Sequence, residues 1–174
     1  SQSPVMAPVA AFIDLEQDFR QARDLDSLRL ALITGARRVV DYDCGLFLEC
    51  GARLAGLMAA GASQGWRVKA ATGTSAIDPQ APLVLAFEQF VKALSEVSAE
   101  ALGKVQMITL DADCAGAALH EQTRGFPHML WVPVRHRDGT LVGAYALFRQ
   151  AAWTPQQATL ATGLAGPFGH AWGA

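Results

Sequence analysis

The stretch WVPVRHRDGTLVGAYALF, residues 131–148, constrains the fold of this chain more than any other. Two apolar runs flank the dipeptide Asp138-Gly139, and Asp-Gly between apolar runs is a strong signal for a β-hairpin. A two-residue turn at this dipeptide places Arg137 opposite Thr140. Continuing the count predicts the pairs Val134 with Gly143, Val132 with Tyr145, and Trp131 with Ala146.

Both faces of this predicted hairpin are largely apolar. One face carries Trp131, Ala144 and Ala146, and the other carries Val132, Val134, Tyr145 and Leu147. A strand pair of this kind must be covered on both sides, because either face would otherwise expose apolar surface to water. Pro133 has no amide hydrogen to donate to a neighbouring strand, so a proline here belongs at an edge or a bulge of the sheet.

Helical periodicity predicts three longer helices, with apolar stripes Phe12, Leu15 and Phe19; Leu28, Leu32 and Ala36; and Leu83, Phe87, Phe90 and Leu94. Asp26 is the expected N-cap of the second helix. A short, weak helix is expected within residues 112–123. The last helix should begin at Thr154, because Pro155 and Gln157 follow it at the spacing of a capping box.

Strands are predicted at residues 44–50 and 105–110, in addition to the hairpin. The first strand places Cys44, Leu46, Leu48 and Cys50 on one face. The range 51–73 is ambiguous, since RLAGLMA and WRVKAAT both alternate as strands do, while the alanine-rich first part could also be helical. The element order predicts an α+β fold, with a mostly antiparallel sheet between helices on both faces.

Length and composition exclude several classes of protein. A chain of 174 residues is long enough for one domain with a real core. With 51% hydrophobic and 17% charged residues, disorder is excluded. The net charge of −2 comes without a basic cluster, so a nucleic-acid partner is not expected. No apolar run is long enough to span a membrane within this chain.

The three cysteines, Cys44, Cys50 and Cys114, form no C-x-x-C pair. An odd number of thiols without such a pair predicts a reducing compartment. The N-terminus lacks the pattern of a signal peptide. We therefore expect a cytoplasmic protein, or the cytoplasmic part of a membrane-associated one. The sequence stops at GHAWGA without a polar terminator, which suggests a fragment of a longer protein.

Residues 132–148, VPVRHRDGTLVGAYALF, together with the WTPQQ helix start at residues 153–157, resemble the GAF domain family. The resemblance extends over residues 1–174 through the order of elements and is specific in the final third. It implies a single domain with a five- or six-stranded sheet, in an α/β/α arrangement. A weaker resemblance of residues 67–84 and the closing GHAW is to GAF-like domains that precede an HlyD-type efflux or secretion adaptor.

The GAF resemblance implies a non-catalytic sensory or regulatory module, with a small molecule bound between the sheet and irregular segments on one face. The terminal helices would lie on the other face and support a homodimer. Phe12, Leu15 and Phe19, together with the small residues Gly163, Gly166 and Gly169, suit such a contact between helices. A purely structural interaction domain without a ligand is the alternative.

A thiol-dependent enzyme of the free methionine sulfoxide reductase type is a third reading, because some GAF domains use cysteine chemistry. A reactive cysteine needs a lowered pKa. Cys44 and Cys50 lie on an apolar strand face instead, and the acidic segment of that reductase family is missing after residue 148. The residues thus favour structural thiols and no enzyme activity.

No cofactor or metal is predicted. Cys114, His120 and His128 match no zinc spacing, and no Cys-His dipeptide of the bilin-binding kind is present. The cyclic-nucleotide signature of GAF domains is absent as well. Arg135 and Asp138 form an R-x-x-D pattern, but this pattern brackets a hairpin turn and is read as solvated charge.

The candidate ligand-binding residues are Arg124, Phe126, His128, Trp131 and Tyr145. Four of them lie in or beside the irregular segment that leads into the hairpin, and binding residues often gather in such segments. Cationic and aromatic side chains together could hold a small anionic or planar ligand. The sequence leaves open whether Phe126 and Trp131 belong to the core and Arg124 is a solvated charge.

Overall fold

The computed structural model describes residues 6–50, 65–112 and 116–172. Its five-stranded sheet has the order β2-β1-β5-β4-β3, and the ladders between neighbours are antiparallel. The strands are β1 (Cys44–Cys50), β2 (Trp66–Ala71), β3 (Gln106–Thr109), β4 (His128–Arg135) and β5 (Leu141–Arg149). The predicted antiparallel α+β sheet is thus confirmed. The ambiguous segment RLAGLMA lies outside the described residues.

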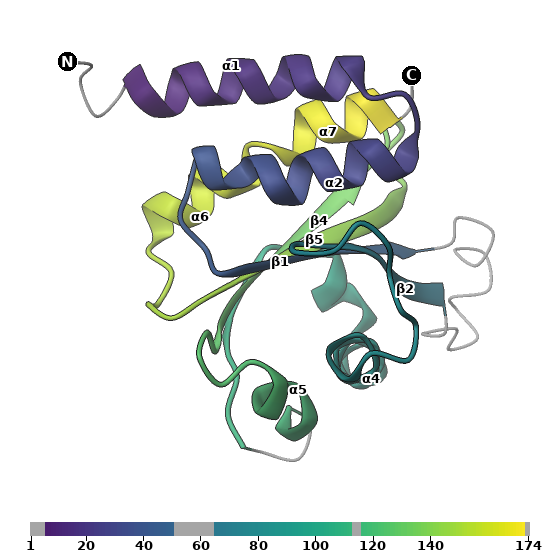
Figure 1. Cartoon of the computed structure of the whole chain (residues 1–174). Helices are drawn as coiled ribbons and strands as arrows, with labels where there is room; N and C mark the ends of the chain where they lie inside the picture. The colour runs from purple at the N-terminus through teal and green to yellow at the C-terminus, as the bar shows by residue number, and fades with distance from the viewer. Residues whose placement is uncertain (1–5, 51–64, 113–115, 173–174) are drawn as a thin grey trace.

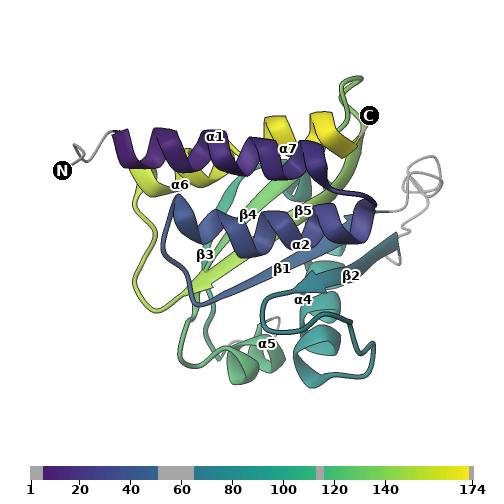
Figure 2. The same ribbon diagram turned by 45° about the horizontal axis from the view of Figure 1, so that its top comes forward.

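Helices cover both faces of this sheet, which gives the three layers seen in Figure 1. One face carries α1 (Met6–Gln21), α2 (Leu25–Gly35), α6 (Pro155–Thr162) and α7 (Ala165–Trp172), and the other carries α4 (Pro82–Val97) and α5 (Ala117–Gln122). Two short 3-10 turns, η1 (Ala36–Arg38) and η4 (Ala99–Gly103), complete the described elements. The first and last helices lie on the same face, as Figure 2 also shows.

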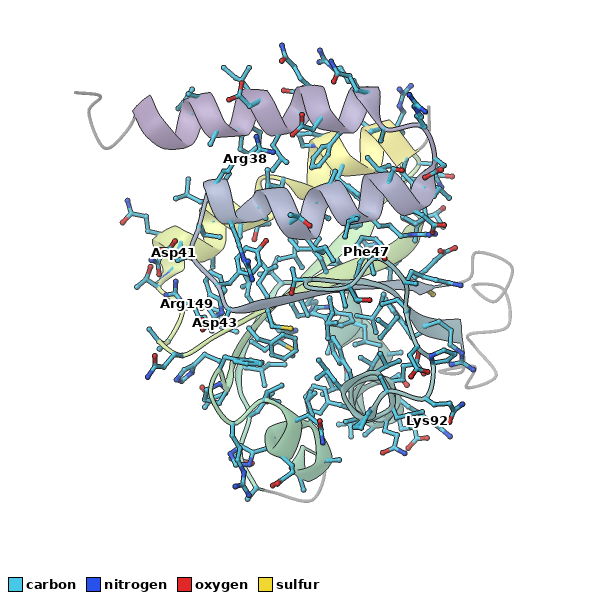
Figure 3. All side chains as sticks on the ribbon, in the orientation of Figure 1. Arg38, Asp41, Asp43, Phe47, Lys92 and Arg149 are labelled. Atoms are coloured by element: carbon cyan, nitrogen blue, oxygen red, sulfur yellow. The ribbon has the colours of Figure 1, made fainter. Side chains whose placement is uncertain are left out.

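The β4–β5 hairpin has the predicted register over most of its length. Val134 pairs with Gly143, and Trp131 pairs with Ala146. The faces are also as predicted: Val132, Val134, Tyr145 and Leu147 pack with the helices α1, α2, α6 and α7, whereas Trp131, Ala144 and Ala146 pack with α4 and α5. In Figure 3, Phe47 of β1 lies on the first of these faces and Lys92 of α4 on the other.

The predicted two-residue turn, with Arg137 opposite Thr140, is wrong. His136 donates its backbone N–H to the Thr140 carbonyl, and Gly139 donates to the His136 carbonyl, both at 2.9 Å. These bonds define a three-residue loop that ends in Gly139 at φ +89°, the geometry of a type I turn followed by a glycine in the left-handed region. A register shift beyond Val134 accommodates the extra residue.

Pro133 lies at a sheet edge although β4 is an inner strand of the sheet. The β3 ladder ends at the pair Gln106 with Trp131, so beyond Trp131 the strand β4 pairs only with β5. Pro133 falls in this part, where a missing N–H leaves no partner of β3 unpaired. The short length of β3 therefore explains how the fold keeps a proline in this strand.

The sequence predicts the N-cap of α6 correctly and the N-cap of α2 incorrectly. Thr154 and Gln157 form the expected capping box at the start of α6, with Pro155 at the first helical position. The expected N-cap Asp26 is wrong, because the Asp24 carboxylate accepts the backbone N–H of Ser27 at 2.7 Å and caps α2. Asp26 lies in the first turn, where an acidic side chain offsets the positive end of the helix dipole.

Arg149, at the end of β5, holds the connection to α6 together. Its side chain is buried and donates to the carbonyl of Ala151 at 3.0 Å and of Ala152 at 2.6 Å, and also to the Gln157 side chain. Its guanidinium carbon lies 4.1 Å from the centroid of the Trp153 ring. Figure 3 shows Arg149 at this end of the sheet, close to Asp41 and Asp43.

Candidate functional site

Five aromatic side chains form a continuous cluster between the sheet and the helices α4 and α5. The ring centroids of Trp66 and Trp131 lie 5.4 Å apart, and those of Phe87 and Phe148 lie 5.5 Å apart. Phe87 joins the two pairs at 6.3 Å from Trp131, and Phe126 extends the group at 6.4 Å from Phe148. We call these residues the aromatic cluster.

The two indoles of the aromatic cluster differ in their hydrogen bonding. Trp131 donates its Nε1–H to the Leu102 carbonyl at 2.9 Å, and η4 holds that carbonyl in place. Trp66 is equally buried, at 1% exposure, but its Nε1–H has no hydrogen-bond partner among the residues that the structure describes. An unpaired buried donor costs about 1–3 kcal/mol of stability. Native proteins keep few such groups, so Trp66 Nε1 calls for an explanation by function.

The buried surroundings of the aromatic cluster are apolar. The buried residues packed around the aromatic cluster are aliphatic, aromatic or thiol side chains, among them Cys44, Cys50, Val68 and Met129. A charged ligand group placed here would lose its hydration without a counter-charge, which is costly. A neutral group that accepts one hydrogen bond from Trp66 would instead remove an existing penalty. The arrangement therefore suits an uncharged, largely apolar ligand with a single well-placed acceptor.

The two described thiols are poorly suited to redox chemistry. Burial raises the pKa of Cys44 and of Cys50 above the ordinary thiol value, which disfavours the reactive thiolate. They lie at opposite ends of β1, which puts their Cα atoms about 20 Å apart at a rise of about 3.3 Å per residue, far beyond disulfide reach. The third cysteine, Cys114, lies outside the described residues.

The structure brings together only two of the five candidate ligand-binding residues. Phe126 and Trp131 both belong to the aromatic cluster. Tyr145 lies on the opposite face of the sheet, fully buried, and donates its hydroxyl to the Ala161 carbonyl at 2.6 Å. Arg124 is exposed and paired with Glu121 at 2.6 Å, while His128 Nδ1 lies 3.0 Å from Thr109 Oγ1.

Trp66 is the residue that the sequence reasoning missed. The strand-like pattern WRVKAAT signals that Trp66 begins a strand, and β2 confirms this. No sequence pattern shows that its indole N–H is unpaired, because this depends on the assembled fold, in which η4 places the Leu102 carbonyl against Trp131. Only the assembled face of the sheet distinguishes the two tryptophans.

Within ranges 6–50, 65–112 and 116–172, no three His, Cys, Asp or Glu side chains gather as a metal site would require. Over the same ranges, no helix combines the length and the apolar character that crossing a bilayer demands.

Comparisons with known proteins give a clear result for the fold alone. No family model matches the sequence, and no curated protein matches it either. Solved structures do match. The GAF domain of an Acinetobacter phosphoenolpyruvate-protein phosphotransferase is 15% identical, with a TM-score of 0.58 over 99% of this chain and 98% of that one.

Two further solved structures are similar. The chromophore-binding domain of a Stigmatella aurantiaca bacteriophytochrome is 16% identical with a TM-score of 0.62, covering 99% of this chain and 62% of that chain. A segment of a methyl-accepting chemotaxis protein is 15% identical with a TM-score of 0.59, covering 91% of this chain and 94% of that one. The comparisons give no support to an HlyD-type adaptor. The sequence motif, the sheet order and these matches agree that the chain has the fold of a GAF domain.

Proposed function

We propose that this chain is a sensory domain that binds a small, uncharged ligand between the sheet and the helices α4 and α5. The single observation that carries the proposal is the buried Nε1–H of Trp66, which has no hydrogen-bond partner among the described residues, within an apolar aromatic cluster. Similar folds occur in a bacteriophytochrome and a chemotaxis protein, which supports a sensory role by analogy.

The ligand chemistry follows from the cluster. The phenyl and indole rings of the aromatic cluster, which Trp66 joins through Trp131, favour a planar or apolar ligand, since ring contacts and apolar burial supply the affinity. A carbonyl or ether oxygen would accept the free N–H. The aromatic cluster is packed, so a ligand must displace side chains on entry, and this movement would be the signal that the domain passes on.

The test uses the four tryptophans as reporters. In 15N-labelled protein, the indole resonance of Trp66 is assigned by its loss in Trp66→Phe. Acetophenone and benzamide, two uncharged aromatic carbonyl compounds, serve as probes and toluene as the probe without an acceptor. We expect saturable downfield shifts of the Trp66 indole proton with the carbonyl probes, and none with toluene. Shifts of equal size at the Trp172 indole, on the other face of the sheet, would argue against a site at Trp66.

A structural interaction domain without a ligand is the second candidate. It is favoured by the dense packing of the aromatic cluster, whose members Trp131 and Phe148 are at most 1% exposed. On this reading the Trp66 N–H is a tolerated defect. The same titration separates the two, because a domain without a ligand would show no saturable change at the Trp66 indole with any carbonyl probe.

We also propose that the domain acts in the cytoplasm as a homodimer. The buried free thiols Cys44 and Cys50 support a reducing compartment. Leu15 and Phe19 do not support the dimer as the sequence suggested, because both are buried within the chain itself. Val9 and Ile13 of α1 offer another apolar strip, 48% and 52% exposed and one helical turn apart.

Sedimentation equilibrium tests the dimer. The parent should show twice the chain mass at micromolar concentration, and a Val9→Glu, Ile13→Glu variant should show the mass of one chain while it remains folded. A matched Leu85→Glu variant, which charges an exposed leucine of α4 on the opposite face, should leave the mass doubled. A monomeric parent would end the dimer proposal and leave the ligand proposal standing.

A further inference from the structure

A surface hollow lies where α1, α7 and the β4–β5 turn meet, remote from the aromatic cluster. It measures about 570 Å³, within the range of small-molecule sites. Figure 2 shows the turn rising beside the end of α7. The walls include Phe19 and Pro167 as apolar surface, and Glu16, Arg20, Arg137 and His170 as polar groups.

The polar groups of this hollow are mainly basic. Arg20 is neutralised in part by Glu16, at 3.1 Å, and both side chains reach solvent. The side chains of Arg137 and His170 make no hydrogen bond or ion pair with any residue that the structure describes. The chain as a whole carries a net charge of −2, so a basic concavity departs from its average surface.

Helix dipoles account for part of this arrangement. Arg20 and His170 lie in the last turns of α1 and α7, where a cation offsets the partial negative charge of the helix end. Arg137 has no such role, because it comes from the β4–β5 turn. Its guanidinium joins the hollow from a third element and retains its full hydrogen-bonding capacity, which suits a bidentate oxyanion.

We propose that this hollow binds a small oxyanion, a phosphate or carboxylate group carried on a short apolar body. Arg137 and His170 would hold the oxyanion, and Arg20 would contribute as far as Glu16 leaves it free. The apolar body would lie against Phe19 and Pro167. The site is separate from the ligand site at Trp66, since the two lie on opposite faces of the sheet.

Phenyl phosphate is the probe for this proposal, in an NMR titration of the backbone amides of the whole chain. We expect saturable shifts at residues 137, 166, 168–171 and 19–22, at lower concentration than with inorganic phosphate, and none with phenol. The affinity should fall as salt is added, because exposed charges are screened over about 8 Å at physiological ionic strength.

Three single-residue variants should change the affinity for phenyl phosphate in different ways. Arg137→Gln should weaken phenyl phosphate binding at least about fivefold, the loss of one charge-assisted bond pair. Glu16→Gln should strengthen it, because Arg20 loses its competing carboxylate. Arg124→Gln removes an exposed arginine on the α5 side and should change nothing. Absence of saturation at millimolar phenyl phosphate, or an equal loss in Arg137→Gln and Arg124→Gln, would overturn the proposal.

Discussion

The guanidinium carbon of Arg29 lies 5.0 Å from the centroid of the Trp172 ring. Arg29 is buried in α2 and donates to Asp26 at 2.9 Å and to Glu49 of β1. The Trp172 ring also stacks on Phe47 of β1, with centroids 5.7 Å apart. The last turn of α7 is thus fixed to both α2 and β1 through one tryptophan.

Trp172→Leu should therefore loosen the end of α7. The variant loses a cation–π contact of about 0.5–2 kcal/mol and a ring contact of about 0.5–1.5 kcal/mol, so the free energy of unfolding should fall by about 1–3 kcal/mol. Urea unfolding measures it. Trp172→Phe keeps a ring over Phe47 and should lose less. Equal midpoints for Trp172→Leu and the parent would show that the contact contributes nothing.

The two indoles of the aromatic cluster give a matched pair of stability predictions. Trp131→Phe leaves the Leu102 carbonyl without its donor, while Trp66→Phe removes a donor that has no partner. Both variants lose similar ring area in the same cluster. Trp131→Phe should therefore be less stable than Trp66→Phe by about 1–3 kcal/mol. Thermal and urea unfolding of both variants check this, and an equal loss would mean that the Trp66 N–H is satisfied in solution.

Gly139 isolates a backbone effect. It has φ +89°, and a Cβ placed on it would meet nothing within 4 Å, so crowding cannot confuse the result. Gly139→Val should cost more than about 1 kcal/mol, because a β-branched residue resists the left-handed region. Gly125 has the same open surroundings without a positive φ, so Gly125→Val should cost clearly less. Parent-like stability of Gly139→Val would contradict the turn geometry.

Much of the fold could be predicted because the side chains of the hairpin strands alternate between two faces and both faces are largely apolar. Trp131 and Tyr145 illustrate what this means for the site. The predicted register already placed them on opposite faces, so the hairpin pattern itself separates them, and the structure confirms this. Trp131 lies beside the irregular segment that suggested the site, whereas Tyr145 does not, and nearness to such a segment carries no information on the face of the sheet.

Other features depend on contacts that no local pattern encodes. Arg149 ends a strand in a segment with little charge, and its burial follows from four acceptors. They are the carbonyls of Ala151 and Ala152 in the β5–α6 connection, the carbonyl of Asp41 before β1, and the Gln157 side chain of α6. The cap at Asp24 rather than Asp26 is a choice between two nearby carboxylates, decided by the one whose backbone is extended. Such choices lie within the usual uncertainty of helix boundaries.

The buried thiols of Cys44 and Cys50 should make the protein less stable in alkaline solution. Burial raises the folded-state pKa of Cys44 and Cys50, so the folded protein holds these protons more tightly than the unfolded chain. Their contribution is complete below the unfolded pKa of about 8.5 and falls as the pH rises through the folded value. The free energy of unfolding should be flat near neutrality and fall above this point. A Cys44→Ala, Cys50→Ala variant should be less stable at neutral pH, but its free energy of unfolding should fall less steeply as the pH rises.

Gly166 and Gly169, three residues apart in α7, differ in the space that surrounds them. A Cβ on Gly169 would lie 2.4 Å from the Arg135 carbonyl oxygen, so α7 approaches β4 as closely as glycine permits. Gly169→Ala must push the helix away from the sheet and should cost at least about 1–3 kcal/mol, the usual effect of overpacking. A Cβ on Gly166 would meet nothing within 4 Å, so Gly166→Ala should be neutral or stabilise by up to about 1 kcal/mol through helix propensity. Urea unfolding should therefore show a lower free energy of unfolding for Gly169→Ala than for the parent, and an equal or higher one for Gly166→Ala.

If both alanines lowered stability equally, Gly166 would have a close neighbour in solution, such as a helix of a second copy. The sequence-based expectation of a helix contact at this glycine would then gain support.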